Sequence, residues 1–365
     1  MFSTKSVLKI NRLIIGILCL YLVSCTPEDD KPDLSGNSKY LDGVLIINGG
    51  NATSSGSVSF FNRETNVIEN DVFEKANGNA AIGGTLNSLY FRNDTAYLVS
   101  TDANKIVVAG KTFQKIQTIN GLEQPRDMVE DFLNLDLSLK TRRAFVTQWG
   151  ANGTNGSIKV INIGTGEIAS TIKTNKGPEK MLYVNRLLWV INSGGAAKDS
   201  TIQQFDLTTD TLFKTLIVPL NPRDIIKDAN SDVWVLCGGY PDRAESGKLV
   251  KLKDNQVVLS FDVPKGADKL VKDKSGNNLY FIADNKIWQK DILSFGKTPP
   301  SVFGGIKKSF QNLTAIGIDT DTENFYCADA IDSKTSGTVF IFDKTTYAEK
   351  SSVKVGIKPI GFIFK

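Results

Sequence analysis

Four adjacent pairs of opposite charge recur along the chain, each at the start of a short apolar run. They are Arg126-Asp127, Glu179-Lys180, Arg223-Asp224 and Asp268-Lys269. The second members of successive pairs are 53, 44 and 45 residues apart, which predicts equivalent places in a repeated structural unit. A carboxylate beside a cation can orient a polar ligand, or it can neutralise its neighbour and fix how the repeats align. The sequence leaves both interpretations open for each pair.

The repeated unit is clearest between Gly177 and Gly195. It has a Pro-led turn, two apolar runs separated by Asn185-Arg186, and a Gly-rich end. This pattern predicts two strands joined by a tight hairpin. Similar units begin at Pro125 and Pro222. Repeats of about 40–50 residues are typical of four-stranded propeller blades.

The two ends of the repeat region are complementary. The first repeat, from Gly43, lacks an inner strand, whereas residues 359–364 are an inner strand without the rest of a repeat. We therefore predict an all-β fold, a seven-bladed β-propeller over residues 43–365 in which the C-terminal strand joins the N-terminal blade. Such closure removes the open sheet edges that favour aggregation.

One mouth of this propeller is the predicted binding site. Strand order brings the Pro-led segments and the Gly-rich loops to the same face, where a concave surface with charges and aromatic rings suits a polar ligand. Among the loop aromatics we expect Trp149 to be the most exposed, followed by Tyr240. By contrast, Trp189, Trp234 and Trp288 lie within strands and are expected to pack between blades. The candidate ligand-binding residues are Arg126, Asp127, Trp149, Glu179, Lys180, Asn192, Arg223, Asp224, Tyr240, Asp268 and Lys269.

Composition excludes several kinds of function. The 365 residues include no histidine, and the net charge is +4, so His-dependent catalysis and His-ligated metals are excluded and strong attraction to nucleic acid is not indicated. The Gly-rich segments lie between strands, unlike a phosphate-binding loop, which precedes a helix. We therefore expect a protein that is not an enzyme, with no cofactor and no nucleic-acid partner.

A metal-dependent hydrolase is the alternative enzyme. Propeller lactonases hold a metal with carboxylates and amides around the axis, and Glu179, Asp224 and Asp268 could take that place. Each of these carboxylates stands beside a cation, which opposes binding of a divalent ion. We therefore expect no metal at these residues.

The N-terminus has the pattern of an export signal. Lys5, Lys9 and Arg12 precede the apolar run Leu13–Val23, which is short for a membrane span. Loss of these three basic residues would lower the net charge from +4 to +1. We predict a signal segment over residues 1–24 and a flexible, acidic tether over residues 25–42.

The sequence Leu22-Val23-Ser24-Cys25 resembles a bacterial lipobox, which would place a lipid anchor on Cys25. A plain signal peptide with an incidental cysteine is the alternative. The cysteines that remain, Cys237 and Cys327, fall on the same strand of non-adjacent repeats, so we expect them to be unpaired and buried.

The Pro-led inner strand, the Trp189–Asn192 run and the Asp-x-x-Thr turn at Asp206 together resemble YVTN-type (YncE-like) propellers, over about residues 43–365. With the lipobox, the chain is similar to propeller lipoproteins of Bacteroidetes outer membranes, including surface cobalamin-binding propellers. The resemblance implies a ligand-binding propeller, anchored through Cys25 and facing the cell surface or, alternatively, the periplasm. It would capture a polar small molecule, such as cobalamin, for a TonB-dependent transporter. A protein-binding or adhesion scaffold is the competing function.

Overall fold

The computed structural model describes residues 39–40, 42–131, 142–293 and 298–365, all within the compact unit Leu34–Lys365. The predicted signal segment 1–24, the lipidation site Cys25 and most of the predicted tether 25–42 lie outside the described residues. Within the described ranges, no helix is both long enough and apolar enough to span a membrane.

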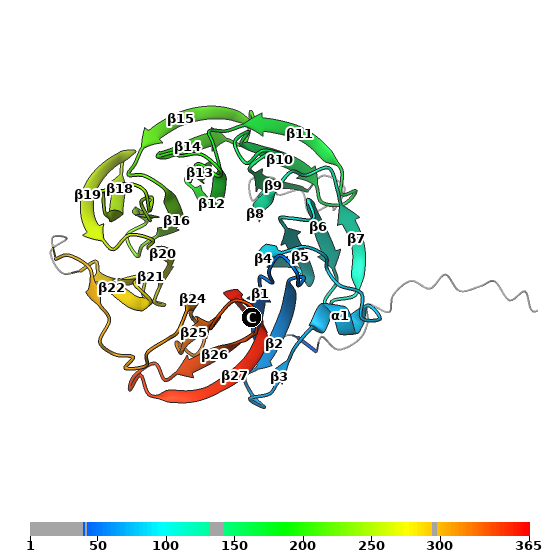
Figure 1. Cartoon of the computed structure of the whole chain (residues 1–365). Coiled ribbons are helices and arrows are strands. Elements are labelled where there is room, and N and C mark those ends of the chain that lie inside the picture. The colour runs from blue at the N-terminus through cyan, green and yellow to red at the C-terminus, as the bar shows by residue number, and fades with distance from the viewer. Residues whose placement is uncertain (1–38, 41, 132–141, 294–297) are drawn as a thin grey trace, which may run out of the picture. The chain divides into compact units, whose positions relative to one another are not determined.

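The described residues form seven four-stranded antiparallel sheets, which confirms the predicted seven-bladed β-propeller. Blades are numbered here so that blade one contains the first strand of the chain. The inner strands surround the axis (Figure 1). In blades one to seven they are β28 (Pro359–Phe364), β4 (Leu86–Arg92), β8 (Pro125–Glu130), β12 (Pro178–Val184), β16 (Pro222–Lys227), β20 (Asp268–Lys272) and β24 (Leu313–Ile318).

The remaining strands follow outward in the same blade order. The second strands are β1 (Gly43–Asn48), β5 (Thr95–Ser100), β9 (Arg143–Gln148), β13 (Leu187–Asn192), β17 (Val233–Cys237), β21 (Asn278–Ala283) and β25 (Phe325–Asp329). The third strands are β2 (Ser57–Asn62), β6 (Lys105–Ala109), β10 (Ser157–Asn162), β14 (Thr201–Asp206), β18 (Gly247–Lys253), β22 (Lys286–Asp291) and β26 (Ser336–Phe342). The fourth strands are β3 (Ile68–Glu69), β7 (Lys115–Ile119), β11 (Ile168–Lys173), β15 (Thr211–Ile217), β19 (Gln256–Val263), β23 (Ser301–Val302) and β27 (Glu349–Ile357).

The hydrophobic core lies between blades rather than within them. Seven clusters of buried side chains occupy the interfaces between neighbouring blades. In β13, Leu188 and Val190 face blade three, whereas Trp189 and Ile191 face blade five, because side chains alternate across a strand. Because both faces of such a strand are covered, its sequence is a continuous apolar run.

The expected positions of the strand tryptophans and of the two cysteines are confirmed. Trp189 and Trp234 are buried in inter-blade clusters, and Trp288 packs against the cluster between blades five and six. Cys237 and Cys327 are buried and unpaired. Burial raises the pKa of both thiols, so they are poor nucleophiles.

The C-terminal strand closes the ring as predicted. Strand β28 pairs antiparallel with β1, with Val44 opposite Phe364 and Ile46 opposite Phe362. The cluster between blades seven and one contains residues of both strands and of β25 and β26. Blade one is therefore assembled from the two ends of the described chain (Figure 1).

An arginine clasp strengthens this closure. Arg63, just after β2, donates two hydrogen bonds to the fully buried Asp319 of blade seven, at 2.8 and 3.1 Å. The same guanidinium pairs with Asp42 at 2.7 Å and donates to the backbone carbonyl of Lys365. One planar cation thus joins both chain ends to blade seven, a geometry that suits arginine and not lysine.

We expect Arg63→Ala to lower the free energy of unfolding by about 3 kcal/mol, because it leaves the buried Asp319 carboxylate without its cation. Arg63→Lys should recover only part of this loss, since an ammonium cannot form the bidentate pair. Chemical denaturation of both variants measures the effect, with Arg186→Ala in the exposed β12–β13 turn as the control. Equal stability of Arg63→Ala and Arg186→Ala would show that the clasp is dispensable.

The end of the predicted tether belongs to the propeller core. Tyr40 is buried and its ring packs edge-on against Phe60 and Phe113. The short helix α1 (Val72–Ala76) covers the same region, where Phe73 joins this cluster. Because a single tyrosine within a polar segment gives no periodic signal, the sequence did not reveal this contact.

Glu74 of α1 is a partly buried carboxyl in which Oε2 has no hydrogen-bond partner. Burial raises the pKa of Glu74 to about 7. The raised pKa means that the folded state holds a proton that the unfolded state releases between about pH 4.5 and pH 7. Stability therefore falls as the pH rises through this window.

We expect Glu74→Gln to be more stable than the wild type at pH 8, by about 2 kcal/mol after allowance for solvent screening. The two proteins should have similar stability near pH 4.5. Thermal unfolding across this pH range measures the difference. A constant gap between the two curves at every pH would contradict the assignment of the titration to Glu74.

Candidate functional site: the axial mouth

Each inner strand has an irregular register with its second strand at the end where the inner strand begins. A β-bulge re-aims a side chain out of the normal alternation. The residues at these seven irregularities are Ile360, Asn87, Arg126, Glu179 with Lys180, Arg223, Lys269 with Leu270, and Thr314, in blades one to seven. All of them except Leu270, which is buried in the core, line one cavity. In each of the seven blades, an irregular register at the start of the inner strand therefore directs a side chain towards the axis.

This axial cavity has a volume of about 700 Å³, within the usual range of about 300–1,000 Å³ for small-molecule sites. Besides the bulged residues it is lined by the Gly49–Ala52 loop of blade one and by Asp102 of blade two. The Pro-led segments reach the cavity as predicted, but among the loops after the second strands only those of blades one and two line it.

Ion pairs run from blade to blade along one half of the cavity. Arg126 of blade three pairs with Glu179 of blade four, with Nε and Oε2 3.0 Å apart. Arg223 of blade five pairs with Asp268 of blade six at 3.2 Å. In both cases the arginine of a Pro-Arg-Asp segment meets the acid of the next blade. The adjacent opposite charges in the sequence therefore correspond to ion pairs between neighbouring blades.

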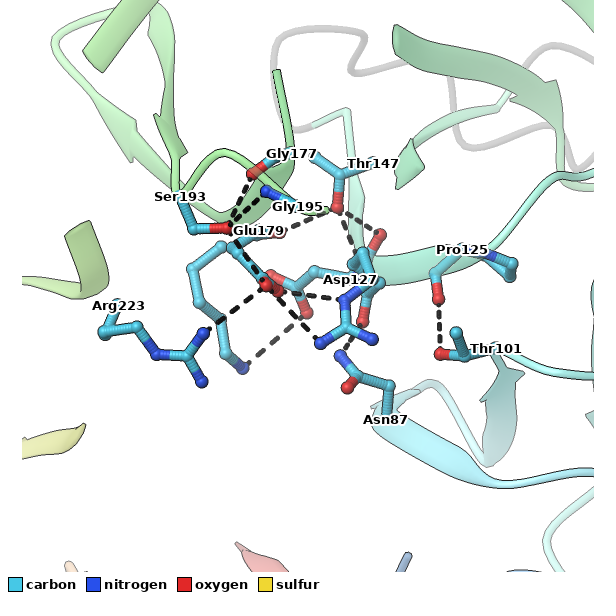
Figure 2. Close-up of polar contacts among 12 residues, drawn as sticks. Asn87, Thr101, Pro125, Asp127, Thr147, Gly177, Glu179, Ser193, Gly195 and Arg223 are labelled. Atoms are coloured by element: carbon cyan, nitrogen blue, oxygen red, sulfur yellow. Dashed lines mark hydrogen bonds and ion pairs between the residues drawn. The ribbon is translucent and has the colours of Figure 1, made fainter. Parts of the chain in front are cut away.

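Glu179 is the centre of this network (Figure 2). Its side chain is 7% exposed, and it lies 3.7 Å from Arg223 as well as 3.0 Å from Arg126. The hydroxyl of Ser193 donates to Oε1 at 3.3 Å. One carboxylate therefore compensates two guanidinium groups in a poorly hydrated place, where the pairing is strong and its loss is costly.

The aspartates of the two Pro-Arg-Asp segments hold the register of the next blade. Asp127 Oδ2 accepts from the backbone N–H of Met181 at 3.2 Å, and Asp224 Oδ2 accepts from that of Leu270 at 3.0 Å. Asp127 is buried and does not line the cavity, whereas Asp224 does. These contacts support the neutralising and aligning interpretation for both aspartates.

Two lysines on the cavity wall are less completely compensated. Lys180 lies 3.9 Å from Asp127, and the charge of Asp127 raises the pKa of Lys180. Burial lowers the pKa of Lys269, and the positive charge of Lys180 lowers it further. Burial likewise raises the pKa of Asp224, against the effect of Lys180. The cavity thus holds fixed charges of both signs at short range.

Besides Asp127, three predicted residues do not reach the cavity. Asn192 is fully buried and donates to Thr201 and Gln203 within its own blade. Trp149 was expected to be exposed, but it is partly buried beneath Arg126, with the guanidinium carbon 4.2 Å from the ring centroid.

Tyr240 is also only partly exposed, and its hydroxyl donates to the carbonyl of Ser193. The same hydroxyl accepts from the backbone N–H of Asp199 at 2.9 Å. Tyr240 thereby ties the loop of blade five to that of blade four. In the structure, Trp149, Asn192 and Tyr240 support the rim and its charges rather than the cavity surface.

The opposite half of the cavity, in blades seven, one and two, was not identified from the sequence. Its bulged residues are the uncharged Thr314, Ile360 and Asn87. The hydroxyl of Thr314 donates to the carbonyl of Pro359 at 2.6 Å, and the amide of Asn87 donates to that of Arg126 at 2.7 Å. These three residues are at the positions in their repeats that the charged pairs have in the other repeats. Because they are a mixture of polar and apolar types, they indicated no particular chemistry.

Within the part of the chain that the structure describes, no three Asp, Glu or Cys side chains gather as a metal-binding group. Glu179 and Asp268, two of the three carboxylates considered for a hydrolase, are instead engaged by arginine. Asp224 accepts backbone hydrogen bonds from Ile225 and Leu270.

Solved structures share this fold at low sequence identity. A quinonprotein alcohol dehydrogenase-like protein from Bacteroides thetaiotaomicron matches with a TM-score of 0.62 and 13% identity, over 89% of this chain and 78% of that chain. A functionally unknown protein from Desulfotomaculum acetoxidans matches with a TM-score of 0.60 and 13% identity, over 89% and 99%. Hydrazine synthase from Kuenenia stuttgartiensis matches with a TM-score of 0.61 and 14% identity, over 80% and 90%. At such identities the likeness shows the fold alone.

No curated protein matches the sequence. The family comparison is more extensive, because it matches residues 42–355, which is nearly the whole propeller. The chain therefore belongs to the family described as "Domain of unknown function (DUF5074)".

Proposed function

We propose that the protein is a ligand-binding propeller that holds a polar small molecule in the axial cavity. The observation that carries this proposal is the convergence of all seven bulged inner strands on one cavity of about 700 Å³. A fold that needed only to neutralise its own charges would not require an open, concave space at the same place. Ion pairs between blades fix the charged side chains before any ligand arrives, which reduces the entropy lost on binding.

The proposal extends to the place of the protein in the cell. With a lipid on Cys25, the propeller would stand at the outer membrane and deliver its ligand to a TonB-dependent transporter. The lipobox-like sequence at Leu22–Cys25 and the resemblance to surface propellers support this part. If it holds, Cys25→Ala should move the protein from the membrane fraction to the soluble fraction of its cells.

Isothermal titration against corrinoids, glycans, nucleosides and organic acids tests the binding proposal. We expect at least one class to bind with a stoichiometry of one. Ala52→Trp should weaken that binding at least tenfold, because Ala52 is exposed on a loop that lines the cavity. Ala151→Trp is the matched control, in the equivalent exposed loop of blade three and away from the cavity. The proposal would be overturned if no compound bound, or if Ala52→Trp bound the ligand as tightly as the wild type.

A protein-binding scaffold is the second candidate, and one observation favours it. The outer strands of blades four and five expose large apolar side chains, with Phe213 60% and Ile217 72% exposed. Exposed apolar patches often mark contact surfaces. Loss of function in Phe213→Ser, with unchanged function in Ala52→Trp, would favour the scaffold over the ligand-binding propeller.

A further inference from the structure

We propose that the ligand carries one anionic group, a carboxylate or a phosphate, which binds between Lys180 and Lys269, while its uncharged part lies over blades seven, one and two. This inference rests on the proposed function and specifies its ligand. It follows from the charges of the axial cavity that already have partners, from those that do not, and from the position of the wall that carries few charges.

Most charged groups of the cavity already have partners from neighbouring blades. The two arginines are held by Glu179 and Asp268. Asp224 accepts two backbone hydrogen bonds. The charges of these groups are therefore balanced within the cavity wall, although each guanidinium keeps N–H donors that these contacts do not use.

The lysine ammonium groups differ from the rest. Lys358 is exposed to solvent, whereas Lys180 and Lys269 are partly buried in the cavity wall. In the described part of the chain, Lys180 has only the 3.9 Å approach to Asp127, which is too long for a hydrogen bond. Lys269 has no ion pair within 4.0 Å there. Each ammonium carries three donors, so both can donate to an oxyanion without breaking a contact that the fold uses.

The two ammonium groups also act on each other. They stand on blades four and six, and both line the cavity. The charge of Lys180 opposes the ionisation of Lys269, although the charge of Asp268 has a larger and opposite effect on the pKa of Lys269. An anion between them would relieve this repulsion and the cost of their partial burial. The backbone at Lys269 has φ of 58°, an uncommon conformation for a residue other than glycine that often marks a functional position.

Charge balance limits the ligand to few negative charges. The cavity is lined by five cations, which include Lys358, and by four carboxylates, which include Asp102. Asp127, which lies 3.9 Å from Lys180, adds a fifth carboxylate and brings the sum of these charges close to zero. A polyanion would therefore meet several fixed carboxylates, whereas a single oxyanion meets two free ammonium groups.

The half of the cavity formed by blades seven, one and two orients the rest of the ligand. Apart from Asp102 and Lys358, its lining residues are uncharged. Thr314, Ile360 and the Gly49–Ala52 loop present small polar and apolar surfaces. A ligand with its anion at blades four and six would place its neutral body against this wall. The cavity thus carries most of its charges on the side of blades three to six, which favours one orientation of an unsymmetrical molecule.

The test compares inorganic phosphate and butyrate with butyramide, the uncharged isostere of butyrate, at constant ionic strength. Titration is made with the wild type, Lys180→Met, Lys269→Met and Lys272→Met. Lys272 is the matched control, exposed on β20 and outside the cavity. We expect phosphate or butyrate to bind the wild type and Lys272→Met, with at least tenfold weaker binding in the other two variants. Butyramide should bind at least tenfold more weakly than butyrate.

A second measurement needs no variant. When the lysines are labelled with ¹³C-methyl groups, the NMR titration of Lys269 should move to higher pH on saturation with phosphate. Equal binding of butyramide and butyrate, retained binding in both cavity variants, no binding of either anion, or an unmoved Lys269 titration would each overturn this inference. If a neutral ligand still bound and Ala52→Trp abolished it, the proposed function would stand without the anion site.

Discussion

Removal of residues 359–365 is expected to abolish cooperative unfolding of the propeller. Strand β28 supplies the inner strand of blade one and contributes Ile360, Phe362, Ile363 and Phe364 to two inter-blade clusters. Full burial of such a side chain contributes about 1.5–3 kcal/mol, so four partly buried ones contribute about 4 kcal/mol, a large share of a typical total of about 5–15 kcal/mol. The deletion also leaves β1 as an open edge at the axis. Circular dichroism during heating and limited proteolysis measure the loss.

A peptide with the sequence of residues 357–365 provides the control for this deletion. Added in excess, it should restore protease resistance, because an edge strand can be completed by a separate chain. The same peptide with Phe362 and Phe364 replaced by serine should not restore it. A sharp unfolding transition in the deleted protein without peptide would show that blade one does not depend on β28.

The second large effect is expected for Glu179→Ala. This change removes the carboxylate that compensates both Arg126 and Arg223. Two partly buried guanidinium groups would then repel each other, so we expect the free energy of unfolding to fall by about 3 kcal/mol. Chemical denaturation measures this loss.

Glu179→Gln separates charge from shape, because the amide keeps the size of the side chain and loses its charge. It should be nearly as destabilising as Glu179→Ala if the ion pairs matter, and nearly neutral if only packing matters. Glu64→Ala, in the exposed β2–β3 turn, is the control for loss of a carboxylate. Wild-type stability in both Glu179 variants would mean that the network is incidental.

The repeat and its closure could be predicted because they rest on strong local signals. Proline at positions 125, 178 and 222 begins an inner strand in each case. The missing inner strand of the first repeat and the isolated segment 359–364 could be matched from their sequences alone. Buried second strands such as β13 read as unbroken apolar runs, which is the pattern expected when both faces are covered.

The details of the site could not be predicted to the same extent. Arg126 and Lys269 were predicted at the axis, but a β-bulge has no strict sequence signature, so the irregular register that positions their side chains could not be predicted. Side chains such as Trp149 and Tyr240 were placed on the correct face, but their burial depends on the loop of the neighbouring blade. Such contacts join residues far apart in the chain, and no single segment encodes them.

A crystal structure of the protein grown with phosphate, or with the tightest ligand of the titration panel, would show both the ligand and the closure of the ring. We expect a molecule in the axial cavity with an oxyanion in contact with Lys180 and Lys269, and β28 hydrogen-bonded to β1. A ligand bound away from the bulged inner strands would rule out the axial site, and residues 359–364 paired with any strand other than β1 would rule out the closure.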